Sequence, residues 1–152
     1  MFDPLLLVSL LGSAATYSHA HSLRQSGCVH TGIFFTPNGV VRNIIMDMDK
    51  NGDGTLEQGE VVSEFVTRYD SDNNGEISEA EFVIKWILRY HDGRDFAVYL
   101  FHHFDKNDDL KLTPADFLAL RTEIDSDGDG KLSEAEFETF MIDIYKNCVP
   151  GS

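Results

Sequence analysis

The stretch Asp125-Ser-Asp-Gly-Asp-Gly-Lys-Leu-Ser-Glu-Ala-Glu136 decides the fold, because two other segments of the chain repeat its pattern. Residues 49–60 and 70–81 are also twelve residues long, with oxygen-bearing side chains at positions 1, 3 and 5. Each segment has Gly at position 6, an aliphatic residue at position 8 and Glu at position 12. We name residues 49–60, 70–81 and 125–136 loops 1, 2 and 4. A repeat of this kind indicates one structural unit that is used several times.

The spacing of these oxygens suits a hard divalent cation. Calcium takes six to eight oxygen ligands at about 2.3–2.6 Å, and alternate positions of a tight loop can point inward together. Gly at position 6 permits a sharp turn. The backbone carbonyl of position 7 can then face the ion, and the closing Glu supplies two oxygens. The candidate ligands are Asp49, Asn51, Asp53, Thr55 and Glu60 in loop 1, Asp70, Asp72, Asn74, Glu76 and Glu81 in loop 2, and Asp125, Asp127, Asp129, Lys131 and Glu136 in loop 4.

The three segments resemble the EF-hand calcium-binding loop, and the resemblance covers roughly residues 37–147. It implies helix-loop-helix units that bind calcium (Ca2+) through the residues just named. The chain is also similar to secreted proteins with several EF hands, including those of mineralised matrices. Its loops are like those of calmodulin, whereas the spacing between them is not.

A fourth segment, residues 105–116 (loop 3), departs from the pattern. Leu110 stands where the other loops have Gly, and the closing residue is Asp116, which is one methylene shorter than Glu. Leu at the turn should strain the backbone, and the shorter acid reaches the ion poorly or with one oxygen. We expect this loop to bind weakly, to prefer magnesium, or to stay empty and support a working loop. The sequence therefore predicts three calcium sites and a weak or empty fourth.

Apolar residues at helical spacing flank every loop and predict an all-α array of about six helices. Thr36 is the expected N-cap and Pro37 the first residue of the first helix. In the fifth helix, which starts at Pro114, we place Phe117 and Leu118 on the buried face with Arg121 and Ile124.

The intervals between the loops predict how they pair. The loops start at residues 49, 70, 105 and 125, so successive starts are 21, 35 and 20 residues apart. An interval of 20 or 21 leaves a single shared helix of about a dozen residues, roughly 18 Å long, with one loop at each end. We therefore expect loop 2 to pair with loop 3 through strands at Ile77 and Leu112, and loop 1 with loop 4 through Leu56 and Leu132. The alternative is two half-domains, 37–92 and 93–147, that pair across a dimer.

The chain ends predict export from the cell. Residues 1–20 have the apolar run and small residues of a signal peptide, with cleavage after Ala20, although a packed N-terminal helix would show a similar run. An N-terminal arm (21–36), an EF-hand domain (37–148) and a tail (149–152) would follow. Cys28 and Cys148 are the only cysteines. In a secreted protein such a pair forms a disulfide more often than it stays as two thiols.

The net charge of -14 disfavours binding to nucleic acid or to anionic lipid, because like charges repel. No segment reaches the roughly 20 apolar residues of a membrane span, and no catalytic pattern emerges, so we expect a non-enzymatic protein. The prediction is a secreted calcium carrier, buffer or calcium-stabilised matrix protein, with a protein partner or a mineral surface left open. The alternative is a calcium sensor that exposes an apolar groove, which the small number of methionines disfavours.

Overall fold

The computed structural model describes residue 28 and residues 36–148. Six helices and two short strands follow one another in these residues, in the order α1 (Pro37–Met48), α2 (Gln58–Tyr69), β1 (Ile77–Ser78), α3 (Glu79–Tyr90), α4 (Arg94–Phe104), β2 (Lys111–Leu112), α5 (Pro114–Ile124) and α6 (Glu134–Asn147). The expected all-α array is confirmed. The expected signal peptide (1–20), nearly all of the arm (21–36) and the tail (149–152) lie outside the described residues.

The first helix begins where its sequence predicts. Thr36 has extended backbone angles, and its hydroxyl oxygen accepts a hydrogen bond from the N–H of Gly39 at 3.2 Å. Pro37 follows as the first helical residue, where its missing N–H removes no helical hydrogen bond. The buried side of this helix is mainly apolar and includes Val41 and Ile44. The N-terminal cap and the burial of one helix face therefore both stabilise α1.

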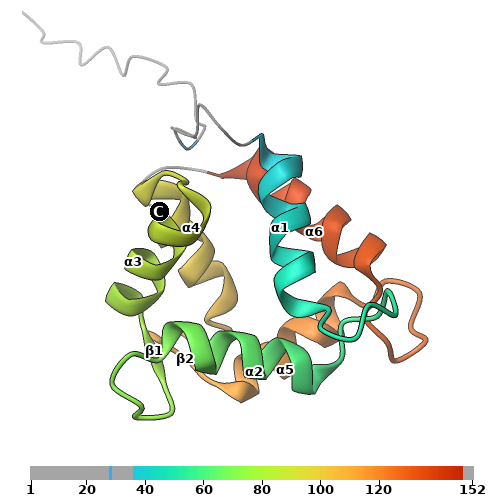
Figure 1. Ribbon diagram of the computed structural model, residues 1–152, viewed down its shortest axis with the longest axis horizontal. Coiled ribbons are helices and arrows are strands. Elements are labelled where there is room, and N and C mark those ends of the chain that lie inside the picture. The colour runs from blue at the N-terminus through green and yellow to red at the C-terminus, as the bar shows by residue number, and fades with distance from the viewer. Residues whose placement is uncertain (1–27, 29–35, 149–152) are drawn as a thin grey trace, which may run out of the picture.

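The helices pack as three pairs, with α1 beside α6, α3 beside α4, and α2 against α5 (Figure 1). Helices α4, α5 and α6 repeat the order of α1, α2 and α3. In this correspondence α1 matches α4 and α6 matches α3, so the α1–α6 pair is equivalent to the α4–α3 pair. The two halves of the chain are therefore related by an approximate twofold axis that passes between α2 and α5. Both shared helices, α2 and α5, lie along one side of the molecule in Figure 1.

The loops pair across the two halves. Strands β1 and β2 are antiparallel, with Ile77 opposite Leu112, and join loop 2 to loop 3. At the other end an isolated bridge joins loops 1 and 4, and the Leu56 N–H donates to the Leu132 carbonyl at 2.7 Å. Both predicted pairs are confirmed within one chain. The arrangement is that of a single compact unit and not of half-domains that meet across a dimer.

Aromatic side chains fill the crossing of α2 and α5. Phe65 and Phe117 are both buried and stack with ring centroids 4.5 Å apart. Phe65 also meets Phe82 of α3 and Phe104 of α4, at 6.4 Å and 6.1 Å. Phe65 therefore contacts rings from three other helices, and burial of such rings is the main favourable contribution to folding.

The prediction for the fifth helix was wrong at Leu118. This side chain is 49% exposed, whereas Leu120 is 4% exposed and lies in the core. The buried apolar positions of α5 are Phe117, Leu120 and Ile124, which follow the spacing of a single helix face. Leu118 is one residue, or about 100°, further around that helix and points away from α2.

The expected disulfide is confirmed. Cys28 is bonded to Cys148, the residue that caps the end of α6, and their Cα atoms are 5.5 Å apart. Both cysteines are buried. Across the part of the chain that the structure describes, the helices are all too short or too polar to cross a membrane.

We predict that Phe65→Ala destabilises the calcium-loaded protein by about 3–5 kcal/mol, because the change leaves a cavity where four helices meet. Urea unfolding in saturating calcium measures this loss. Leu118→Ala serves as the control and should change the free energy of unfolding by less than about 0.5 kcal/mol, since it is exposed. Equal losses in the two variants would contradict the packing described here.

Candidate metal centres

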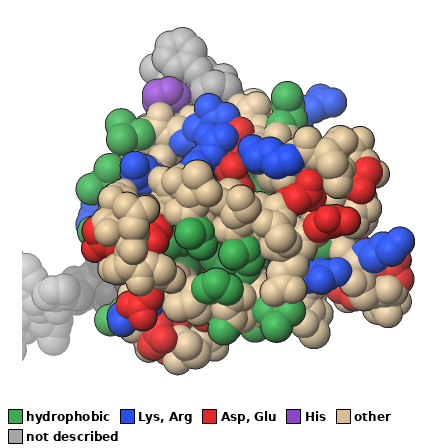
Figure 2. All heavy atoms as spheres, turned by 60° about the horizontal axis from the view of Figure 1, so that its bottom comes forward, with side chains coloured by type: hydrophobic (Ala, Val, Ile, Leu, Met, Phe, Trp, Pro, Cys, Tyr) green, Lys and Arg blue, Asp and Glu red, His purple; other side chains and the backbone are tan. Residues whose placement is uncertain are grey.

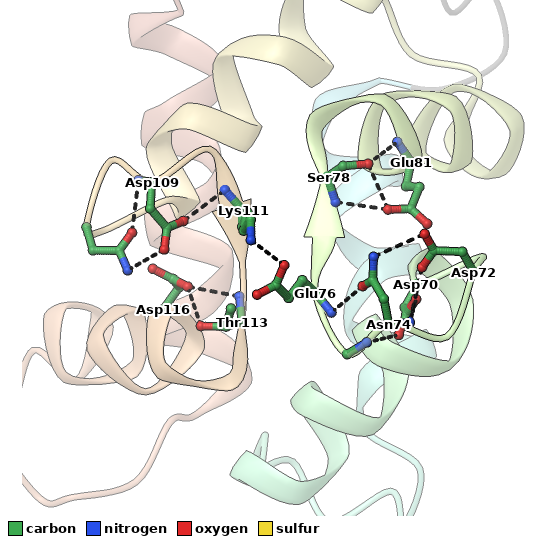
Figure 3. A network of polar contacts seen from close by, with 12 residues as sticks. Asp70, Asp72, Asn74, Glu76, Ser78, Glu81, Asp109, Lys111, Thr113 and Asp116 are labelled. Atoms are coloured by element: carbon green, nitrogen blue, oxygen red, sulfur yellow. Dashed lines mark hydrogen bonds and ion pairs between the residues drawn. The ribbon is translucent and has the colours of Figure 1, made fainter.

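Loop 2 gathers three carboxylates at one point. Asp70, which caps the end of α2, Asp72 and Glu81 of α3 each offer an oxygen atom, and these atoms all lie within 4.8 Å of one another. Figure 3 shows the side chains of Asp72 and Glu81 facing one another across the loop. Backbone N–H groups hold the first ligand in place, because Asp70 accepts from Asn74 at 3.1 Å and from Gly75 at 2.9 Å.

Loop 4 repeats this arrangement. Asp125, Asp127 and Glu136 likewise offer oxygens within 4.8 Å of one another. Asp125 accepts from the N–H groups of Gly128 and Gly130, both at 2.8 Å. The remaining predicted ligand at position 5, Asp129, accepts from the Lys131 N–H at 2.7 Å. The donor set consists of oxygens alone, which is the set that a hard cation such as calcium prefers.

Loop 1 has the same backbone framework with one neutral ligand. Asp49 accepts from the N–H groups of Gly52 and Gly54, at 2.7 Å and 3.1 Å. Position 3 is Asn51, whose side-chain oxygen accepts from the Asp53 N–H at 2.8 Å. The closing Glu60 accepts from Lys50 at 3.1 Å, so both ends of the loop are in contact. Loop 2 likewise has one amide, Asn74 at position 5. Among the described residues, the clusters of three carboxylates lie in loops 2 and 4, so loop 1 shares the framework but not the gathered carboxylates.

At position 7 of each loop the predicted ligand is the backbone carbonyl, so the side chain at this position is free to make other contacts. The Glu76 carboxylate accepts from the Lys111 Nζ at 2.5 Å, so it points from loop 2 towards loop 3 (Figure 3). The Thr55 backbone forms the β-bridge to Ser133 of loop 4, and the Lys131 side chain is exposed. The ion pair between Glu76 and Lys111 adds a side-chain contact to the strand pair that joins loops 2 and 3.

Each closing acid also starts the next helix. Glu81 accepts from the N–H and the hydroxyl of Ser78, the N-cap of α3, and the Ser78 hydroxyl accepts in turn from the Glu81 N–H. Ser133 and Glu136 form the same capping box at the start of α6. These helix caps are not among the features predicted above from the sequence. The pattern Ser-x-x-Glu at the start of an apolar helix would have identified them.

Hydrogen-bond donors keep these closing acids charged. The backbone N–H and the hydroxyl of Ser133, at 3.0 Å and 2.8 Å, lower the pKa of Glu136 to about 2. The pKa of Glu81 also lies below its ordinary value, because donation from Ser78 and Ser71 outweighs the desolvation that would raise it. Both groups are therefore carboxylates at neutral pH, which is the form that binds a cation.

Loop 3 keeps the framework but loses the glycine. Leu110 has a φ of +65°, which is the left-handed region that Gly130 occupies at +78° in loop 4. An L-residue with a side chain is disfavoured there by about 1–2 kcal/mol. Asp116 still caps α5, since it accepts from the Thr113 N–H at 2.9 Å and from the Lys106 N–H at 3.1 Å. It is 2% exposed, so the shorter acid is buried in its capping role.

A comparison with family models matches residues 122–141 to the EF hand. These residues run from the end of α5 through loop 4 into α6. No curated protein matches the chain. Together with the repeated helix-loop-helix geometry, the match supports membership of the EF-hand calcium-binding superfamily. The match and the two carboxylate clusters indicate calcium binding, and members of this superfamily are typically not enzymes.

We predict that Glu81→Gln lowers the calcium stoichiometry by one ion, because it removes a charged ligand from loop 2 while keeping an oxygen for Ser78. Isothermal titration calorimetry counts the sites. Glu79→Gln is the matched control, since Glu79 lies on the first turn of the same helix and pairs with His102 at 3.2 Å, outside the cluster. An unchanged stoichiometry in Glu81→Gln would contradict this ligand assignment.

We also predict that Leu110→Gly combined with Asp116→Glu adds one calcium ion to the stoichiometry. Gly removes the strain at position 6, and Glu restores the second oxygen at position 12. Leu110→Gly alone should leave the stoichiometry unchanged, because the closing acid stays short. A native chain that already binds four ions with similar affinity would contradict this expectation.

Proposed function

We propose that this chain is a secreted, non-enzymatic calcium-binding protein. It carries or buffers extracellular calcium, or it uses bound calcium to hold a structural or matrix protein in shape. The observation that carries this proposal is the gathering of Asp70, Asp72 and Glu81, and of Asp125, Asp127 and Glu136, in loops whose donors are all oxygens. Loop 1 has the same framework and is the third proposed site.

Two features support a location outside the cell. The first 20 residues have the pattern of a signal peptide, and the disulfide between Cys28 and Cys148 belongs to an oxidising compartment. Extracellular EF-hand modules bind calcium in the range of about 10⁻⁴–10⁻³ M. A carrier or structural protein with such affinity stays largely filled where calcium is near millimolar.

A calcium sensor is the second candidate, and one observation favours it. An apolar hollow lies between α2, α5 and α6, and its lining includes Val61, Phe65, Phe117, Leu120 and Phe137. Figure 2 turns the α2–α5 side forward and shows hydrophobic side chains gathered near the middle of this face. A sensor would widen such a hollow on binding calcium and accept a partner helix.

We predict that calcium occupies the binding loops only when its concentration is near millimolar, and that the binding of a hydrophobic dye changes little as it does so. The disulfide joins Cys28, which precedes α1, to Cys148 at the end of α6, and this link resists the helix movement that a sensor needs. The dye fluorescence and the calcium occupancy are measured in the same titration. A large rise in dye fluorescence at micromolar calcium supports the sensor and contradicts the carrier or structural role.

A further inference from the structure

A buried carboxylate joins the first helix to the third. Asp47, the last residue but one of α1, is 7% exposed. Arg89 of α3 donates to both of its oxygens, from Nε to Oδ2 at 2.8 Å and from Nη2 to Oδ1 at 2.5 Å. The Tyr90 hydroxyl donates to Oδ2 at 3.1 Å. We call Asp47, Arg89 and Tyr90 the clamp.

Further ion pairs extend the clamp to loop 1. Arg68 of α2 lies 3.5 Å from Asp47 and forms an ion pair with Glu64, which is also on α2 and is 7% exposed. The other Glu64 oxygen accepts from the Lys50 Nζ at 3.0 Å. Lys50 is position 2 of loop 1, so a continuous run of charges connects loop 1 to the end of α3.

The clamp closes a triangle of helices. Loop 1 lies between α1 and α2, and loop 2 lies between α2 and α3. The clamp ties α1 directly to α3, which are the first and last of the three consecutive helices α1, α2 and α3. When an EF hand changes its metal state, the angle between its two helices changes, by a large amount in sensors and by a small amount in buffers. With α1 tied to α3, the angle at loop 1 and the angle at loop 2 cannot change independently.

Separating the two sides of the clamp would be unfavourable. The Asp47 side chain is 10% exposed, so separating it from Arg89 would leave a desolvated charge without its main partner. The clamp is also formed while Asp70, Asp72 and Glu81 are gathered in loop 2. It therefore belongs to the arrangement in which loop 2 is ready for an ion.

We infer that the clamp couples loops 1 and 2, so that calcium in loop 1 raises the affinity of loop 2 and the reverse holds equally. The coupling is reciprocal because it is one free energy shared by two binding equilibria. It is separate from the backbone pairs, since loop 1 is bridged to loop 4 and loop 2 to loop 3. The inference rests on the proposed calcium sites in loops 1 and 2.

A thermodynamic cycle measures this coupling. All chains carry Glu136→Gln to silence loop 4. One chain keeps loops 1 and 2, one adds Glu60→Gln and one adds Glu81→Gln, so that each loop is also titrated alone. The two-site binding constant divided by the product of the two single-site constants is the coupling factor. We expect a factor of about five or more.

The cycle is then repeated in Arg89→Gln and in Asp47→Asn, which keeps an oxygen for the Tyr90 hydroxyl. In both variants we expect the coupling factor to fall to about one. Lys85→Gln is the matched control, because Lys85 lies one helical turn before Arg89 on α3 and outside the clamp. This control should keep the native factor. Circular dichroism and urea unfolding of each chain establish that it is folded.

Two results would overturn the inference. The first is a coupling factor near one in the chain with the native clamp. The second is a native coupling factor in both clamp variants, whether or not their single-site binding is weaker. The last result would show a clamp that only stabilises the fold. Loops 1 and 2 that bind no calcium at all would overturn the proposed function as well, whereas two sites that fill independently would overturn the coupling alone.

Discussion

The shared helix is the constraint on which the rest of the structure depends. Helix α2 has 12 residues and carries loop 1 at its start and loop 2 at its end. Such a helix is about 18 Å long, so it holds its own two loops apart. Helix α5 does the same for loops 3 and 4. Each loop can therefore pair only with a loop of the other helix, and this requires α2 and α5 to cross face to face. The stacked rings of Phe65 and Phe117 occupy that crossing.

The closing acids connect folding to metal binding. In loops 2 and 4 one carboxylate satisfies the free N–H groups at a helix start and also lies among the candidate ligands. Gathering like charges is unfavourable, and hydrogen-bond donors hold Glu81 and Glu136 as carboxylates despite it. Bound calcium would neutralise the gathered charges. Loop 3 separates the two roles, because Asp116 keeps the helix cap while its shorter side chain is poorly suited to reach an ion.

The sequence predicted the parts of this structure that depend on spacing and composition. Twelve-residue repeats located the loops, and the intervals between them predicted which loops pair, because helix length sets distance. The sequence did not predict the clamp, since Asp47 and Arg89 are 42 residues apart and only the folded arrangement of α1, α2 and α3 brings them together. Leu118 was misplaced because neighbouring leucines on a short helix fit two phases almost equally well. The ligand sets of the three loops remain predictions.

The disulfide has a topological consequence. The approximate twofold axis relates the contact between α1 and α6 to the contact between α3 and α4. In the second case a short turn at residues 91–93 links the two helices covalently. In the first case no peptide bond can do so, and the bond between Cys28 and Cys148 takes its place. The molecule is therefore a covalent ring of two similar halves, and a single break in the backbone between those cysteines would open the ring without separating the halves.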